Sequence, residues 1–442
     1  MSKQARPCNR VKLRLGNVCS KIGSGSTPRG GNSVYLDEGV ALIRSQNVLN
    51  DRFNPEGLAF IDEEHAKQLK GVTINAEDVL LNITGDSVAR VCQVSSSVLP
   101  ARVNQHVAII RPDSNKLDPK YLRYYLVNPQ IQQELLAMAG AGATRNALTK
   151  GMIEQLEIDA PESIDDQHAI AYILGTLDDK IDLNRRMNET LEAMARAIFK
   201  SWFVDFDPVH AKASGEPPES ICRRLGLTPD VLALFPDSFQ DSELGGIPAG
   251  WAVRSLDSVA DFLNGLALQK YPTTDDCWLP VIKIAQLRAG HTVGADHAST
   301  EIPPAYVVQD GDVLFSWSGS LEVEIWCGGP GALNQHLFKV TSSDYPKWFY
   351  FLWTRHHLQE FRDIAANKAT TMGHIQRKHL TDAKLFCPDE NLLSSMEAIV
   401  GPLISKLVSC RLEANEMTSM RDTLLPRLLS GELSVPELEA AA

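Results

Sequence analysis

The chain of 442 residues carries the triplet Asn-Gln-His twice, in "RVNQHVAII" (102–110) and in "ALNQHLFKV" (332–340). Carboxamides such as those of Gln105 and Gln335 can pair with the N6 and N7 edge of adenine. His106 and His336 are candidates for the same surface. An apolar β-type run follows each triplet, and successive side chains of a strand point to opposite faces. We therefore expect one side chain of each triplet to hold backbone in place while another faces a ligand.

Further polar and basic side chains lie in Gly-, Ser- and Thr-rich segments, which indicate loops. Arg and Lys can bind guanine O6 and N7, and Ser or Thr can serve either base. A single polar loop residue usually forms a turn or a cap, but the clusters taken together favour contact with a ligand. The candidates in the first half are Ser24, Ser26, Thr27, Arg29, Arg44, Gln46, Asn47, Thr84, Arg90, Thr144, Arg145, Asn146 and Lys150. The candidates in the second half are Lys270, Lys283, Gln286, Ser316, Ser318, Ser320, Lys368, Thr370 and Thr371.

The match between the two halves extends beyond the triplets. "VALIRSQNV" (40–48) parallels "LPVIKIAQL" (279–287), "EDVLLNITG" (77–85) parallels "GDVLFSWSG" (311–319), and "YLRYYL" (121–126) parallels "WFYFLW" (348–353). The offset falls steadily along the chain from 239 to 227, as small loop deletions in the second copy would produce. The sequence therefore predicts an internal repeat in which the two triplets are equivalent positions.

Each copy begins with short β-type runs separated by Gly, Pro, Asn and Asp, and ends in a helical segment. Apolar residues at alternating spacings of four and three run from Ile170 to Trp202 and again from Met396 to Leu428, with Arg421 as the exception. This spacing is typical of coiled-coil helices. Two separate surface helices are the alternative, but the matching seams favour antiparallel pairing. The expected pairing residues are Leu177, Ile181, Leu191 and Ile198 on one helix and Leu403, Leu407, Met417 and Leu424 on the other.

These patterns predict an α+β fold with a pseudo-two-fold internal repeat. Two β-rich domains, residues 10–160 and 251–390, are joined by a pair of long antiparallel coiled-coil helices, residues 165–204 and 392–430. Residues 205–250 are rich in Pro, Gly, Ser and acidic side chains, so we expect an irregular connector with one short helix.

Charge, apolar runs and cysteines bound the class of protein. The net charge is −12, yet residues 1–150 hold 19 basic and 13 acidic side chains, whereas residues 151–245 hold 8 and 19. A surface that binds DNA is therefore compatible with the first segment. The chain has no run of 18 apolar residues and no apolar leader at its start, which predicts a cytoplasmic protein without a membrane span. Eight scattered cysteines without a CxxC pair indicate buried, reduced thiols.

Catalytic motifs are missing from the sequence. It contains no GxxxxGK[ST] phosphate loop, no GxSxG elbow and no HExxH zinc motif. His356 and His357 are adjacent on an expected helix, so they cannot bind one metal ion together. We therefore expect a non-catalytic chain without a metal site.

Three segments resemble the conserved regions of one family, the specificity (S) subunits of type I restriction–modification enzymes. They are "LGTLDDKIDLNRRMNETLEAMARAIFKSWFVDFDPVHAK" (174–212), "FPDSFQDSELGGIPAGW" (235–251) and "LLPRLLSGEL" (424–433). The resemblance implies two target-recognition domains that each read half of a split double-stranded DNA sequence. It also implies methyltransferase (M) and motor or restriction (R) subunits as partners. S-adenosylmethionine, ATP and Mg would then belong to those partners, with no cofactor bound by this chain.

One segment departs from the repeat, because "NKATTMGHI" lacks the Arg-Asn of "GATRNAL", so contacts cannot be transferred between the copies there. Two alternatives remain open. The first is a stand-alone DNA-binding or anti-restriction scaffold without a methyltransferase partner. The second is an uncharacterised enzyme, which the missing motifs disfavour.

Overall fold

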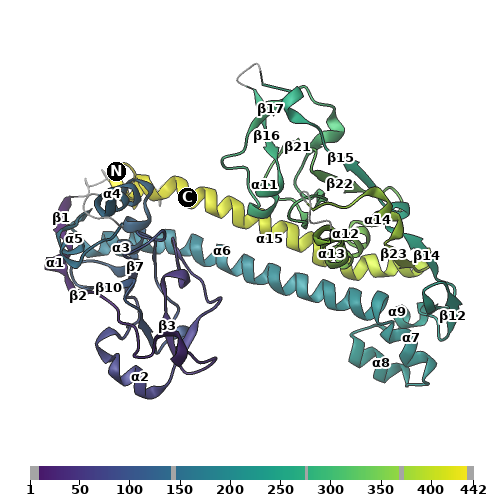
Figure 1. Ribbon diagram of the computed structural model, residues 1–442, viewed down its shortest axis with the longest axis horizontal. Coiled ribbons are helices and arrows are strands. Elements are labelled where there is room, and N and C mark those ends of the chain that lie inside the picture. The colour runs from purple at the N-terminus through teal and green to yellow at the C-terminus, as the bar shows by residue number, and fades with distance from the viewer. Residues whose placement is uncertain (1–8, 141–145, 274–276, 368–372, 436–442) are drawn as a thin grey trace, which may run out of the picture. The chain divides into compact units, whose positions relative to one another are not determined.

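The computed structural model describes residues 9–140, 146–273, 277–367 and 373–435 (Figure 1). The chain divides into two compact units, Met1–Lys180 with Met417–Ala442 (unit 1) and Ile181–Glu416 (unit 2). Each of the two long helices contributes one part to each unit, and the units are described separately below.

Unit 1 contains two packed sheets and a strand pair. The pair is β1 (Arg10–Arg14) with β11 (Glu157–Pro161). The antiparallel four-stranded sheet has the order β2 (Cys19–Ser24), β10 (Val107–Pro112), β7 (Val79–Asn82) and β8 (Val91–Cys92). The three-stranded sheet has the order β6 (Ala59–Ile61), β3 (Val40–Ile43) and β9 (Ala101–Val103), with β3 and β9 parallel. A short hairpin joins β4 (Val48–Leu49) to β5 (Arg52–Phe53).

Helices cover the other face of the four-stranded sheet. They are α1 (Leu15–Val18), α3 (Pro119–Val127), α4 (Pro129–Gly140) and α5 (Lys150–Gln155), whereas α2 (Glu63–Gln68) packs on the three-stranded sheet. The continuous apolar run of β7 follows from this double burial, because side chains alternate along a strand. Val79 and Leu81 pack with the core formed by α3 to α5, whereas Leu80 packs with β3 and β9. The carboxylate of Asp118 caps α3 by accepting the N–H of Tyr121 at 2.6 Å.

Unit 2 repeats this arrangement with its own strands and helices. The strand pair is β14 (Ala252–Ser255) with β23 (Lys384–Cys387). The four-stranded sheet has the order β15 (Asp261–Asn264), β22 (Leu337–Thr341), β19 (Val313–Ser316) and β20 (Val323–Ile325). The second sheet has the order β17 (His297–Ser299), β16 (Trp278–Ile282), β21 (Gly331–Leu333) and β18 (Val307–Val308), with β16 and β21 parallel. The helices are α10 (Leu256–Val259), α11 (Ile284–Ala289), α12 (Lys347–His356), α13 (Leu358–Ala366) and α14 (Arg377–Asp382).

The common strand order confirms the predicted internal repeat. The acidic partner of an ion pair is repeated with it. Asp78 bonds Arg111 at 2.7 Å in unit 1, and Asp312 bonds Lys339, two positions earlier on the matching strand, at 2.7 Å in unit 2. The sequence alignment had paired Asp78 with Asp312 from their neighbours alone. The predicted α+β fold is thus confirmed.

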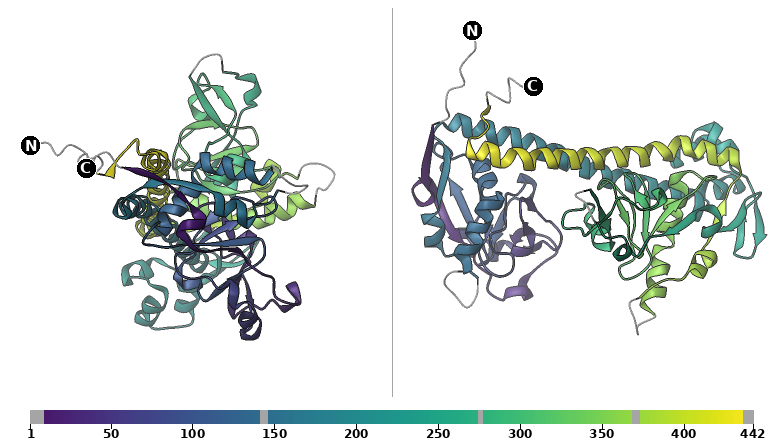
Figure 2. Two further views of the ribbon diagram at one scale, coloured as in Figure 1. Left: turned by 90° about the vertical axis from the view of Figure 1, so that its left-hand side faces the viewer. Right: turned by 90° about the horizontal axis from the view of Figure 1, so that it is seen from above.

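The two long helices are α6 (Ile164–Phe199), which continues as a π-helical turn over Lys200–Val204, and α15 (Glu390–Ser430) (Figure 2). Their segments pair antiparallel within each unit. In unit 1, Ile170 and Leu174 share a core with Leu425 and Leu428. In unit 2, the apolar pairing is interrupted at the buried Asn184, whose Nδ2 donates to Glu413 at 3.1 Å.

The expected pairing residues differ in burial. Ile181 and Leu407 are each 2% exposed. The other six are half-buried: Leu177, Leu191, Ile198, Leu403, Met417 and Leu424. Further buried positions on these helices are Ala195, Met396, Val400 and Ile404, which lie in the unit 2 core.

The connector is more regular than expected. It contains three helices, α7 (Asp207–Ala213), α8 (Pro218–Leu225) and α9 (Pro229–Leu234), and a hairpin of β12 (Phe239–Ser242) and β13 (Gly245–Pro248). The expectation of a single short helix was wrong because a proline lies in the first turn of each of these helices. Proline is tolerated there, since the first turn has no intrahelical use for its N–H. The many prolines of this segment therefore indicate the first turns of helices and not an irregular chain.

The structure also bears on the expected absence of a membrane span and on the expected burial of the cysteines. By length and composition alone α15 could cross a membrane, with a mean hydropathy of 1.3 over its most apolar window, but a core helix passes the same test. Its side chains Met396, Val400 and Leu407 are buried within the protein. Among the cysteines that the structure describes, Cys277 is exposed, so the expectation of buried thiols was wrong there. It precedes β16, outside the packed part of the sheet.

Candidate nucleic-acid interface

In the triplet of unit 1 one side chain holds the backbone and another is exposed, as expected. Asn104 is buried, and its Oδ1 accepts the backbone N–H of His106 at 3.1 Å. The Nδ1 atom of His106 lies 2.7 Å from the Thr84 hydroxyl. Gln105 is exposed, with its Nε2 3.2 Å from His106 Nε2. The asparagine therefore fixes the turn before β10, and the glutamine is presented to solvent.

The triplet of unit 2 has the same geometry. Asn334 is buried and accepts the N–H of His336 at 3.2 Å. His336 Nδ1 lies 2.9 Å from the Ser318 hydroxyl, and Gln335 Nε2 lies 3.4 Å from His336 Nε2. Gln335 is half-buried. Equivalent positions in the sequence are thus equivalent positions in space.

A glycine passes close to each triplet. A Cβ on Gly25 would lie 2.3 Å from the carbonyl oxygen of Asn104, and a Cβ on Gly265 would lie 2.2 Å from that of Asn334. Both distances are shorter than any van der Waals contact, so only glycine fits. The Gly-rich loop of the first half is thereby held against the triplet.

Other loops complete a cluster around each triplet. In unit 1 the Thr84 segment pairs with Ala147, and Ser26 donates its N–H to Val103 at 3.0 Å. In unit 2 Ser318 pairs with His374 in the same way. We call these two groups the triplet clusters: residues 25–26, 84, 104–106 and 146–147 in unit 1, and residues 265–266, 318, 334–336 and 373–374 in unit 2.

A second pair of equivalent loops follows β3 and β16. Asn47 Oδ1 accepts the N–H of Arg44 at 3.1 Å, and Gln286 Oε1 accepts that of Lys283 at 3.3 Å. The alignment had matched these residues. Asn47 is fully buried and its Nδ2 also donates to the carbonyls of Asn54 and Glu56. As a base-contacting residue Asn47 was therefore a wrong prediction, because its hydrogen bonds shape the loop.

Two serines need the same correction. Ser316 is fully buried: its hydroxyl donates to the Ser320 carbonyl at 2.7 Å and accepts the Glu322 N–H at 2.7 Å. Ser318 is 3% exposed and holds His336. Neither hydroxyl is available to a ligand, because each closes the loop after β19. Sequence could not separate them from the exposed Ser320.

The remaining candidates fall into three groups. Exposed candidates are Ser24, Ser26, Arg29, Gln46, Arg90, Asn146, Lys150, Lys270 and Ser320, with Lys150 paired to Glu154. Half-buried candidates are Thr27, Arg44, Thr84, Lys283 and Gln286, of which Arg44 donates to the Gly57 carbonyl and Lys283 pairs with Asp296. Thr144, Arg145, Lys368, Thr370 and Thr371 lie outside the described residues.

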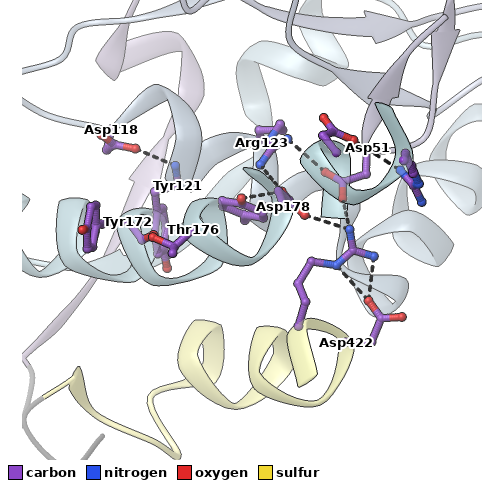
Figure 3. A network of polar contacts seen from close by, with 12 residues as sticks. Asp51, Asp118, Tyr121, Arg123, Tyr172, Thr176, Asp178 and Asp422 are labelled. Carbon is purple, nitrogen blue, oxygen red and sulfur yellow. Dashed lines mark hydrogen bonds and ion pairs between the residues drawn. The ribbon is translucent and has the colours of Figure 1, made fainter. Parts of the chain in front are cut away.

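The sequence analysis missed a buried ionic network in unit 1 (Figure 3). Arg421 Nη1 bonds Asp51 at 2.8 Å and Asp178 at 2.9 Å, and Arg123 bonds Asp178 at 2.7 Å. Burial raises the pKa of Asp51 to about 6, against the opposing effect of Arg123. Burial also opposes the charge of Arg421, yet Asp51 and Asp178 hold the Arg421 pKa above its ordinary value. The one signal of this network in the sequence was Arg421, a charged residue at a position where the helix spacing predicts an apolar one.

No group of three or more His, Cys, Asp or Glu side chains that could hold a metal ion occurs in the described part of the chain. The two triplet clusters carry amides, hydroxyls and basic side chains on equivalent frames. Fold and site together define a duplicated protein with two equivalent loop clusters.

Comparison with known proteins makes this class more particular. The family model "Type I restriction modification DNA specificity domain" matches residues 9–193. The chain is 25% identical to the type I restriction enzyme HindI specificity subunit of Haemophilus influenzae, over 89% of this chain and 94% of that protein. It is 25% identical to the MjaIX specificity subunit of Methanocaldococcus jannaschii, over 95% and 92%. The crystal structure of the type I restriction–modification S subunit from M. genitalium has the same fold, with a TM-score of 0.60 at 15% identity over 97% of this chain and 98% of that one. The resemblance to the specificity (S) subunits of type I restriction–modification enzymes is therefore confirmed over nearly the whole chain.

Proposed function

We propose that this chain is the sequence-specific DNA-binding subunit of a type I restriction–modification complex. Residues 10–160 read one half of a bipartite target, and residues 251–390 read the other. The observation that carries the proposal is the pair of triplet clusters, which hold Gln105 and Gln335 in the same geometry on equivalent frames. Because the two frames are alike, both domains should dock on DNA in the same way. Because the residues around the frames differ, the two half-sites should differ in sequence.

Direct readout suits the exposed side chains of unit 1. Gln105 can pair with adenine, while Arg29 and Arg90 can reach guanine. Phosphate contacts by residues such as Lys150 would add affinity without sequence preference. In unit 2 the proposed contacts are the half-buried Gln335, equivalent to Gln105, and the exposed Ser320 and Lys270.

The long helices are the proposed docking surface for methyltransferase (M) subunits and, in the nuclease, for motor or restriction (R) subunits. Residues 151–245 hold 8 basic against 19 acidic side chains, a charge that suits a protein partner better than DNA. In this proposal the chain is non-catalytic and cytoplasmic, and S-adenosylmethionine, ATP and Mg belong to the partners. The relatives named above are specificity subunits, which supports this division of labour.

Paired substitutions test the two-half assignment. Gln105→Ala is expected to relax base preference in one half-site, and Gln335→Ala in the other, each by about 1–3 kcal/mol at single positions. Sequencing DNA selected from a randomised library by the complex measures both halves at once. Gln359→Ala, on the exposed face of α13 where it bonds Asp363, is the control and should change neither. If one substitution alters both half-sites, the modules do not read independently.

A second experiment tests the absence of catalysis. The purified chain is incubated with DNA and S-adenosylmethionine, and separately with ATP and Mg. Neither methyl transfer nor cleavage is expected. Activity that persists after partner subunits are removed would contradict the proposal. Failure of any methyltransferase to copurify with the native chain would instead favour a stand-alone DNA-binding scaffold.

A further inference from the structure

The ionic network of unit 1 joins elements that are far apart in the chain. Asp51 lies in the turn between β4 and β5, Arg123 on α3, Asp178 on α6 and Arg421 on α15. These four side chains are between 14% and 21% exposed. The network therefore connects the β-rich part of unit 1 to both long helices at once.

The contacts form a closed ring. Each arginine bridges the same two carboxylates: Arg421 at 2.8 and 2.9 Å, and Arg123 at 3.4 Å to Asp51 and 2.7 Å to Asp178. Asp178 also accepts the hydroxyl of Tyr124 at 2.6 Å. Three of these contacts are charge-assisted hydrogen bonds and therefore directional, whereas Arg123 to Asp51 is an ion pair without a hydrogen bond. The three bonds favour one arrangement of the four elements.

The backbone at Asp51 is adapted to this position. Its φ of 63° is left-handed, and its N–H donates to the Val91 carbonyl at 2.7 Å. Asp adopts this conformation more readily than most residues, which suits it to the tight turn between β4 and β5. The turn of β4 and β5 thus presents the Asp51 carboxylate to α15.

Arg421 is the member that breaks a pattern. It occupies a seam position of α15 at which the heptad spacing calls for an apolar side chain, and Leu425 and Leu428 follow it in the unit 1 core. An apolar residue would pack there without needing partners, so a buried ion network is weak evidence for extra stability. A polar residue at a seam position instead specifies register, because a shifted helix leaves it unpaired.

We propose that Arg421 is a positioning residue that fixes the first recognition domain to both helices in one register. Through that register it sets the orientation in which the unit 1 triplet cluster meets DNA. The inference rests on the proposed function and deepens it. It predicts that a residue without any DNA contact of its own controls how well one half-site is read.

The test uses the full chain with its copurifying methyltransferase. Arg421→Met is expected to reduce base discrimination in the first half-site at least tenfold and to broaden the accepted gap, while discrimination in the second half-site stays within twofold of wild type. DNA selection is run well below the melting temperature of the variant. Arg421→Lys keeps the charge but cannot bridge two carboxylates equally, so an intermediate loss is expected. It also replaces the Met variant if that variant does not fold.

Arg427→Met is the matched control. Arg427 lies on the same helix and pairs only with Glu432 among the described residues, with its side chain 44% exposed. The Arg427→Met variant should discriminate bases in both half-sites as well as wild type does. Equal losses in both half-sites for Arg421→Met, or no loss, would overturn the inference. If the wild-type complex itself shows no base discrimination in either half-site, that result contradicts the proposed function and does not test the positioning role of Arg421.

Discussion

The two units have the same loop frame but differ in what they add to the ion pairs that attach them to the long helices. Unit 1 uses the ionic ring of Asp51, Arg123, Asp178 and Arg421. Unit 2 also has ion pairs to both helices, from Arg355 to Glu192 on α6 at 2.7 Å and from Arg411 on α15 to Glu324 at 3.1 Å. It adds extensive aromatic packing, in which the ring of Phe199 on α6 lies 4.9 Å from that of Trp353, edge-on.

The aromatic attachment extends well beyond one pair. Phe203 lies within 5.6 to 6.2 Å of Trp251, Trp348, Phe349 and Trp353. Such packing gains free energy from buried area and depends little on direction. Unit 2 should therefore derive more stability from apolar burial at its attachment than unit 1 does.

The largest expected effect is on the aromatic side of this comparison. Trp353→Ala removes a ring that is 1% exposed, and a deletion of this size costs about 3–5 kcal/mol. Denaturant unfolding of the full chain measures it. Trp278→Ala is the control, because Trp278 is 44% exposed and should cost well under half as much. Similar costs for both would show that unit 2 does not depend on its aromatic core.

A pH dependence sharpens the ionic side. Burial raises the folded-state pKa of Asp51 from 3.8 to about 6, although Arg123 and Arg421 oppose the shift while Asp178 and Asp422 add to it. A raised acid pKa means that the folded state binds the extra proton between those values, so stability from this group is present at low pH and is lost as pH rises through about 6. The shift corresponds to at most about 3 kcal/mol.

Asp51→Asn removes this titration. The variant should therefore gain stability relative to wild type as pH rises from 4 to 8, which parallel urea titrations at several pH values would measure. Asp113→Asn is the control: the Asn115 N–H lowers the pKa of this surface carboxyl below its ordinary value, so its titration lies below this window and the variant should run parallel to wild type from pH 4 to 8. A difference between Asp51→Asn and wild type that is flat with pH would contradict the burial argument.

The smallest expected effect tests the shared frame. Asn104→Ala and Asn334→Ala each remove one buried acceptor of a His N–H, at a cost of about 1–2 kcal/mol. Because the two geometries match within 0.1 Å in that bond, at 3.1 and 3.2 Å, the two costs should agree closely. Thermal unfolding of both variants measures the pair. Clearly different stability losses for the two variants would mean that the two frames share a geometry but contribute differently to stability.

Regular patterns were readable from the sequence. The repeat followed from matched segments around Gln105 and Gln335, and the long helices followed from their apolar spacing. These features depend on local order along the chain. The division of labour within each triplet was also predictable, since a strand alternates its faces.

Features that depend on distant contacts were not readable. Asn47 and Ser316 look like free loop residues, but each is buried because its bonds close a turn. Besides its neighbour Asp422, the partners of Arg421 lie 243 and 370 positions away, so the sequence around Arg421 does not identify them. The connector helices were hidden because proline was taken as a breaker and not as a first-turn residue.

The close passage of Gly25 and Gly265 beside the triplets has a consequence for how new specificities arise. These backbones have no room for a side chain, so the course of each loop is settled before its exposed residues are chosen. Under the proposed function, a change at Ser26 or Gln105 would alter which base is preferred without changing the course of the chain. Target preference would then diversify by single substitutions, each on a frame that already folds.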